Sequence, residues 1–181
     1  MTDNLDLGRP TSGDVIDLIL DDHRLFEALL RDLRDKSSDR DAVRRAFSAL
    51  HVAHAEAEEA EVYPTLRKKD AISDHEAEHG EEEHAEGHEA LLKVLEAENL
   101  EGEEFDDLIE ELATAVNHHL TEEELTILNP AREEVDPGVR ERLGAAFATA
   151  RNEQLDSDCG RVENVREIVK RAEKEGLLDD D

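Results

Sequence analysis

Three segments of the chain each carry two potential metal ligands spaced four residues apart. These pairs are His54 with Glu58, His84 with His88, and His119 with Glu123. Residues four apart project side by side from one face of a helix. A further histidine, His23, lies in an earlier segment of helical periodicity. If four helices packed together, five imidazoles and two carboxylates would therefore converge.

All of these side chains fall on the apolar stripes of their segments. His23, for example, continues the stripe of Ile16, Ile19 and Phe26. A buried polar group without a partner costs about 1–3 kcal/mol, and a buried charge costs more. Bound cations satisfy lone pairs and carboxylate charge together. Imidazole mixed with carboxylate suits iron, with zinc, manganese or copper as alternatives, and two bridging carboxylates imply two metal ions.

Four long helices are predicted to position these ligands, over residues 12–36, 39–69, 73–98 and 102–134. We expect Ser12 to cap the first helix, and Ser73 with Glu76 to form a capping box on the third. Pro64 should kink the second helix or end its regular part. Because the connections are short, neighbours run antiparallel, and the fold class is all-α, an up-down-up-down four-helix bundle. No segment has the alternating pattern of a strand.

The bundle is predicted to span residues 12–135, between a loose N-terminal tail (residues 1–11) and a C-terminal helical extension (residues 136–181). Asp136 and Pro137 have the pattern of a helix start. A linker over residues 154–160 should precede a last short helix, 161–174, that Gly176 ends. The extension would dock on the bundle, bind a protein partner or stay mobile. The linker holds Cys159, which we expect to be a plain thiol, open to intermolecular oxidation if exposed.

Charge and composition exclude several classes of function. The net charge is −29, so a nucleic acid would be repelled. Between Asp74 and Glu124, 20 residues are acidic and one, Lys93, is basic, which gives either a solvated surface or a face that attracts cations or a basic partner. No apolar run suits a membrane span, and the N-terminus has no apolar signal region. The single cysteine excludes an intrachain disulfide, and we expect a cytoplasmic protein.

Specific phrases in the chain resemble the hemerythrin-like family, also called HHE cation-binding domains. The resemblance covers residues 12–134 and rests on His23, on HAEAEEAEVYPTL from His54 to Leu66, on HAEGH from His84 to His88, and on HLTEE from His119 to Glu123. It implies two non-haem iron ions joined by an oxo or hydroxo bridge. The implied roles are listed by metal: His84, His88 and His119 on one iron, His23 and His54 on the other, and Glu58 and Glu123 bridging both.

This ligand set would leave one coordination position open, on the iron with two histidines. Dioxygen, peroxide or nitric oxide could bind there, which implies a role in the response to oxidative or nitrosative stress or in its sensing. Two alternatives remain open. One is an enzyme that disproportionates peroxide in the manner of a catalase, and the other is a protein that stores or donates iron.

Several further residues have two interpretations. The core stripe favours His119 over His118 as the ligand, although family members place their carboxylate five residues after the histidine, a step that His118 matches. We expect His51 on the surface or, failing that, in support of the ligands. His75 and His79 should be solvated, or else form an accessory cation site. Tyr63 would pack at the bundle end or act near the iron pair, and Phe26, Phe47 and neighbouring leucines would line an apolar pocket.

Overall fold

The computed structural model describes residues 5–178, and this part of the chain is helical and contains no strand. The helices are α1 (Val15–Arg34), α2 (Arg40–Ala57), α3 (Tyr63–Lys68), α4 (Asp74–Glu96), α5 (Glu103–Glu123), α6 (Asn129–Glu134), α7 (Pro137–Asp156) and α8 (Val162–Glu175), with two π-helical segments, η1 (Glu58–Val62) and η2 (Glu124–Leu128). The prediction of an all-α protein is confirmed. Among the helices described, none has the length and apolar character needed to cross a bilayer.

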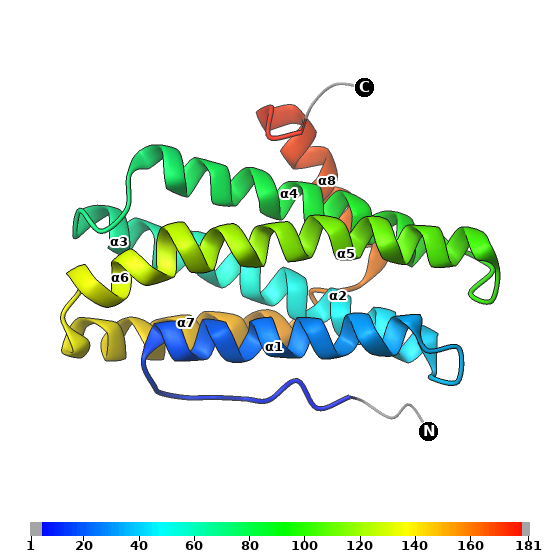
Figure 1. The fold of residues 1–181 in the computed structure, drawn as a ribbon, viewed down its shortest axis with the longest axis horizontal. Coiled ribbons are helices and arrows are strands. Elements are labelled where there is room, and N and C mark those ends of the chain that lie inside the picture. The colour runs from blue at the N-terminus through cyan, green and yellow to red at the C-terminus, as the bar shows by residue number, and fades with distance from the viewer. Residues whose placement is uncertain (1–4, 179–181) are drawn as a thin grey trace.

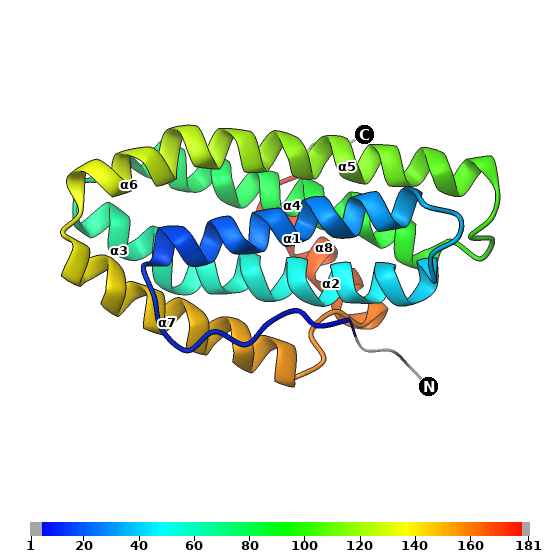
Figure 2. The same ribbon diagram turned by 60° about the horizontal axis from the view of Figure 1, so that its bottom comes forward.

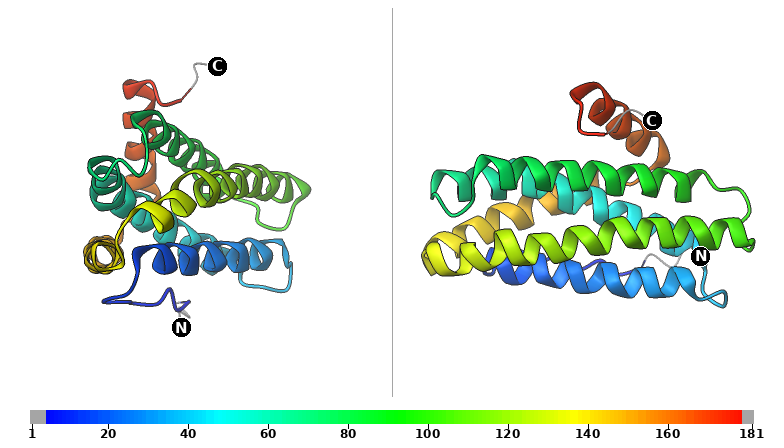
Figure 3. Two further views of the ribbon diagram at one scale, coloured as in Figure 1. Left: turned by 60° about the vertical axis from the view of Figure 1, so that its left-hand side comes forward. Right: turned by 45° about the horizontal axis from the view of Figure 1, so that its top comes forward.

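The long helices lie along one axis, and consecutive ones run in alternating directions (Figure 1). The run α2–η1–α3 is helical without a break, as is the run α5–η2–α6. Helix α7 packs beside α1 and α2, and α8 packs against α4 at an angle to the long axis (Figures 2 and 3). The sites of the predicted ligands therefore lie on four helices that face one another.

Two of the predicted helix starts can be compared with the structure. Ser73 accepts a hydrogen bond from the backbone N–H of Glu76, whose carboxylate accepts one from Ser73 N–H, so the capping box is confirmed. The prediction for Ser12 is wrong, because Asp14 caps α1 and accepts from Ile16 N–H. Gly13 between them has a φ of 140°, which keeps Ser12 outside the helix.

Both π-helical segments end two residues before a proline. Pro64 and Pro130 each lack an N–H, and each ring would crowd the carbonyl four residues earlier in a regular α-helix. The widened turn instead lets Tyr63 N–H bond to the Glu58 carbonyl and Asn129 N–H bond to that of Glu124. Pro64 therefore ends the regular part of α2 without ending the helical run. π-Helical turns of this kind occur often at functional sites.

Two apolar clusters fill the interior, and a polar layer separates them. One cluster includes Val15, Ile16, Val62 and Ile127 at one end of the bundle. The other includes residues from the later part of α1 and the early part of α5, such as Phe26. On each of the four helices, the predicted ligands lie where residues of one cluster give way to residues of the other. Rigid packing on both sides can therefore fix the polar layer.

The C-terminal extension docks on the bundle. Phe147 of α7 joins the cluster that contains Val15, while Val165 and Val169 of α8 pack with Val52 of α2. The predicted linker is shorter than expected, because α7 continues to Asp156. Gly176 ends α8 in the left-handed conformation, as predicted.

Cys159 is buried, which agrees with the plain thiol expected and leaves the sulfur closed to intermolecular oxidation. Its thiol lies 3.4 Å from the carbonyl oxygen of Ala49, to which it can donate. Burial raises the pKa of Cys159 to about 11, which keeps the thiol protonated and unreactive at neutral pH. The next residue, Gly160, packs so closely on the backbone of Ala49 that a Cβ atom would lie 2.4 Å from its nitrogen.

The N-terminal segment is also more ordered than predicted. Residues 1–4 of the expected tail lie outside the described residues. From residue 5 onward the chain lies along the bundle, and Arg151 donates hydrogen bonds to the carbonyls of Leu7 and Gly8. Asn152 donates to the carbonyl of Pro10. The described part of this segment is therefore fastened to α7 rather than loose.

Candidate metal centre

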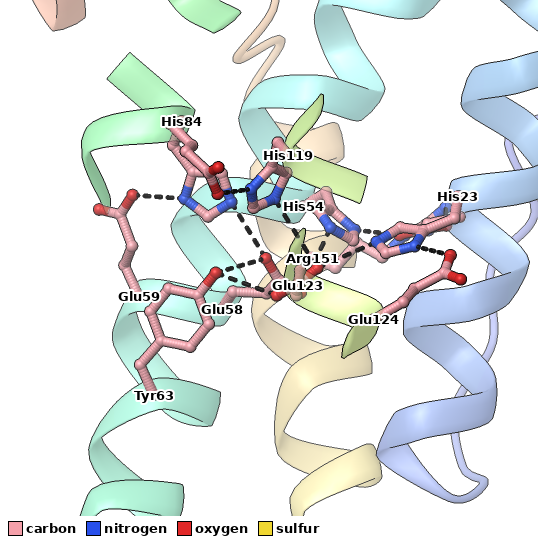
Figure 4. A network of polar contacts seen from close by, with 12 residues as sticks. His23, His54, Glu58, Glu59, Tyr63, His84, His119, Glu123, Glu124 and Arg151 are labelled. Atoms are coloured by element: carbon pink, nitrogen blue, oxygen red, sulfur yellow. Dashed lines mark hydrogen bonds and ion pairs between the residues drawn. The ribbon is translucent and has the colours of Figure 1, made fainter. Parts of the chain in front are cut away.

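The structure buries all seven predicted ligands in the polar layer. They are His23 of α1, His54 of α2, Glu58 of η1, His84 and His88 of α4, and His119 and Glu123 of α5. Figure 4 shows His23, His54, His84 and His119 around the carboxylates of Glu58 and Glu123. Ligand atoms of six of these residues fall into two groups of three, each compact enough for one metal ion.

The first group, which we call the α1 side, consists of His23, His54 and Glu123. His23 Nε2 lies 3.0 Å from Glu123 Oε2. The second group, the α4 side, consists of Glu58, His84 and His119. His84 Nε2 lies 3.1 Å from Glu58 Oε2.

Each carboxylate also reaches across to the other group. Glu58 Oε1 lies 3.3 Å from His54 Nε2 on the α1 side. Glu123 Oε2 lies 3.7 Å from His119 Nε2 on the α4 side. Both carboxylates therefore lie between the two sets of imidazoles, which is the position that a bridging ligand requires.

His88 stands apart from both groups. Its Nε2 atom is buried and has no hydrogen-bond partner. Its ring packs edge-on against the ring of His51, with 4.6 Å between centroids. His51 is itself buried, so the expectation of a surface position is wrong. Burial and the nearby His84 lower the pKa of His88 to about 3, which leaves its imidazole neutral.

The four histidines of the two groups are each held by a second carboxylate at Nδ1. The contacts are His23 to Glu124 at 2.8 Å, His54 to Asp22 at 3.0 Å, His84 to Glu59 at 2.8 Å, and His119 to Glu83 at 2.9 Å. A carboxylate there fixes the proton on Nδ1 and leaves Nε2 free for a metal ion. Such outer carboxylates orient metal-binding histidines in many proteins.

These contacts pass from helix to helix around the bundle. Asp22 of α1 supports the histidine of α2, and Glu59 of η1 supports His84 of α4. Glu83 of α4 supports the histidine of α5, and Glu124 of η2 supports His23 of α1, which closes the circle. None of these four carboxylates was predicted from the sequence. A signal was present, because each is the immediate neighbour in sequence of a predicted ligand.

Arg151 extends this support from the C-terminal extension. Its guanidinium makes two hydrogen bonds of 2.8 Å to the two carboxylate oxygens of Asp22. Burial opposes ionisation of Asp22, but His54 and Arg151 outweigh it and lower the pKa of the carboxyl. Arg151 was not predicted, although it follows Leu143 and Phe147 at intervals of four on the buried face of α7.

Tyr63 closes the layer on the side of the carboxylates. Its hydroxyl donates to Glu123 Oε1 at 3.0 Å and lies 3.4 Å from Glu58 Oε2. The approach depends on Gly80 of α4, where a Cβ atom would lie 2.8 Å from the hydroxyl oxygen. Burial and the two carboxylates raise the pKa of Tyr63 well above its usual value. Tyr63 packs in the apolar cluster at the bundle end, as one interpretation predicts, and its hydroxyl also contacts candidate ligands; a role near the iron pair stays a prediction.

The remaining histidines are exposed. His75 and His79 lie on the solvent side of α4, as predicted. His118 points to solvent while His119 enters the layer, so the core stripe distinguished the two neighbours.

The donor set fits metal ions. Four atoms of the two groups are buried and have no hydrogen-bond partner; they are the Nε2 atoms of His54, His84 and His119, and Oε1 of Glu58. Burial alone would lower the pKa of His54, but Glu58 and Asp22 outweigh it and raise the pKa to about 10. The same attraction overcomes burial and holds the pKa of Glu58 well below its usual value. The centre therefore combines negative charge with imidazoles that would exchange a proton for a cation on binding, and these are conditions for cation binding.

The fold and the site together define a helical-bundle protein with a buried histidine and carboxylate centre. The sequence matches the hemerythrin HHE cation-binding domain over residues 14–130, and the chain belongs to that family. No curated protein and no solved structure matched the chain in the searches made. Membership in the family supports cation binding at this centre, whereas Arg151 lies outside the matched residues.

Proposed function

We propose that the four helices carrying the centre act as an up-down-up-down bundle that holds two non-haem iron ions and binds dioxygen, peroxide or nitric oxide. The observation that carries this proposal is the placement of Glu58 and Glu123 between the two sets of imidazoles. A carboxylate shared by two histidine groups suits a pair of ions better than one ion.

The residues would divide between the ions as follows. His23 and His54 would hold one iron, and His84, His88 and His119 would hold the other, with Glu58 and Glu123 bridging. The iron pair supplies the capacity to bind and reduce small oxygen- or nitrogen-containing ligands. The α1 side has one histidine fewer, so it is the side with room for such a ligand.

The chain's own residues prepare the site for this use. Phe26 and Phe147 pack edge-on against His54, with centroids 5.2 and 5.8 Å away, and present apolar surface to the α1 side. Such a wall excludes water and strengthens electrostatic interactions inside it. The hydroxyl proton of Tyr63 is held between the two carboxylates, where it offsets their charge.

The test is metal content and absorption spectrum of protein produced in iron-supplemented cells. We expect about two irons per chain and a charge-transfer band that shifts on addition of azide, peroxide or nitric oxide. Glu58→Gln should lower the iron content and abolish the band, while the matched control Glu56→Gln, two residues earlier on α2, should change neither. Wild-type protein with no iron, or with a featureless spectrum, would contradict the proposal.

A further inference from the structure

A third group of potential ligands lies outside the buried centre. His79 and Glu83 are four residues apart on α4, and His118 approaches them from α5. His79 Nε2 lies 3.4 Å and His118 Nε2 lies 3.3 Å from the same oxygen, Glu83 Oε1. The three ligand atoms all lie within 4.8 Å of one another. Two imidazoles and one carboxylate therefore converge on one point.

The carboxylate oxygen at this point has no hydrogen-bond partner. The Glu83 side chain is only 4% exposed, and its other oxygen, Oε2, is bonded to His119 Nδ1. Oε1 is buried, and neither of the nearby imidazoles has the geometry to donate to it. A buried acceptor left without a donor is unfavourable. A cation between Oε1 and the two Nε2 atoms would remove this cost.

The two histidines are open to solvent, in contrast to those of the centre. Their side chains are 46% exposed for His79 and 58% exposed for His118. His79 Nδ1 lies 3.6 Å from the exposed carboxylate of Glu82, which adds negative charge beside the group. An ion bound here would have protein ligands on one side and water on the other.

We propose that His79, Glu83 and His118 form a second, solvent-facing site for a divalent transition-metal ion. Two imidazoles with one carboxylate form the donor set of several zinc and iron(II) sites, and the positions facing solvent would be filled by water. Magnesium and calcium prefer oxygen ligands, so they should compete weakly. Because Glu83 also holds His119 Nδ1, the two sites would share this carboxylate. The site is thus placed where an ion can bind from solvent beside the buried centre.

Calorimetric titration with Zn²⁺ tests the site by counting the zinc ions bound per chain. Excess Mg²⁺ is present, so that the acidic surface is already occupied. The titration is made on iron-loaded protein and repeated on protein stripped of metal. We expect the double variant His79→Ala/His118→Ala to bind one ion fewer per chain than wild type in both preparations. Both substitutions are at exposed positions, and circular dichroism should show an unchanged helical fold.

The control is His75→Ala, which removes an exposed histidine one turn before His79. It should keep the full zinc stoichiometry. Equal stoichiometry in wild type and the double variant would overturn the second site, as would an equal loss in the control. The comparison between variants does not require iron in the centre. A missing iron pair would therefore contradict the proposed function while the surface site could still be measured.

Discussion

The two sides of the buried centre are supported in different ways. On the α1 side, His54 is held by Asp22, whose side chain is 7% exposed and is paired with Arg151, itself 1% exposed. On the α4 side, His84 is held by Glu59, which is 34% exposed, and His119 by Glu83, which borders the exposed His79 and His118. The C-terminal extension thus covers the carboxylate that holds His54, whereas Glu59, and also Glu124, which holds His23 on the α1 side, are partly open to solvent.

This difference shows what the extension contributes to the centre. Residues 14–130 match the family, and they alone would leave the carboxylate of Asp22 without its arginine partner. Helix α7 supplies that partner and an aromatic wall through Phe147. We expect His54 on the α1 side to keep its geometry without metal, because the ion pair with Arg151 already compensates its outer carboxylate, Asp22. The α4 side should depend more on bound ions.

Removing the metal should have the largest effect and should act unequally on the two sides. A ligand present at about 1,000 times its dissociation constant stabilises the native state by about 4 kcal/mol. Chelation under reducing conditions should therefore lower the melting temperature by roughly 8–16 °C for a chain of this size. Hydrogen exchange should increase more in peptides that cover residues 79–91 than in those that cover residues 15–26. Equal increases would contradict the comparison.

Breaking the Arg151 ion pair should have the next largest effect. Arg151→Ala leaves Asp22 as a buried carboxylate without its partner, and losses of this kind cost about 3 kcal/mol or more. Urea unfolding of metal-free protein should show this decrease in the free energy of unfolding.

The matched control for this prediction is Arg166→Ala. Arg166 forms an ion pair with Glu96 on the surface, where both side chains are nearly half exposed. Pairs of this type contribute about 0–1 kcal/mol. If Arg151→Ala and Arg166→Ala lowered the free energy of unfolding equally, the buried Arg151 pair would contribute no more stability than a surface pair. The α1 side would then have no extra support from the extension.

The outer carboxylates provide a direct comparison of metal affinity between the two sides. Substitution of such a residue usually weakens metal binding about 10–100-fold. Asp22→Asn should weaken metal binding by about 100-fold, near the upper end of this range, because no water can replace a carboxylate buried beneath α7. Glu59→Gln should weaken it by only about 10-fold, because Glu59 is partly solvated. Competition with a coloured chelator measures both values, and a larger loss for Glu59→Gln would reverse the interpretation.

How far the sequence predicts this site depends on whether an interaction lies within one helix or joins residues of different helices. Helical periodicity is local, so it placed His54 and Glu58, or His119 and Glu123, on buried faces. The supporting carboxylates act across helices, from Asp22 to His54 for instance, and local periodicity does not report such contacts. Arg151 lies about 130 positions from Asp22, and only the packing of α7 brings them together.

The unexpected order near the chain ends has the same origin. Residues 5–10 have the polar composition of a loose segment, which predicts exposure, and Cys159 lies in the segment predicted as a linker. Both are nevertheless fixed by the extension, through Arg151 and through the close approach of Gly160 to Ala49. Tertiary contacts decided these positions, whereas the capping box of Ser73 and Glu76 depended only on neighbours in sequence.

Tyr63 gives the smallest expected effect and tests what the two sides share. Its hydroxyl contacts the carboxylates of both Glu58 and Glu123 (Figure 4). Tyr63→Phe keeps the ring and removes one hydrogen bond, which should cost about 1 kcal/mol in metal-free protein. Thr114→Val is the control, because it removes an exposed hydroxyl bonded to a carbonyl on α5 and should change stability by less than about 0.5 kcal/mol.

The same variant, Tyr63→Phe, also tests metal affinity. Since the Tyr63 hydroxyl touches both carboxylates, the loss of affinity should be equal for the first and second ion, whereas the outer-carboxylate variants should weaken the binding of one ion more than the other. An unequal loss in Tyr63→Phe would place the tyrosine in support of one side alone.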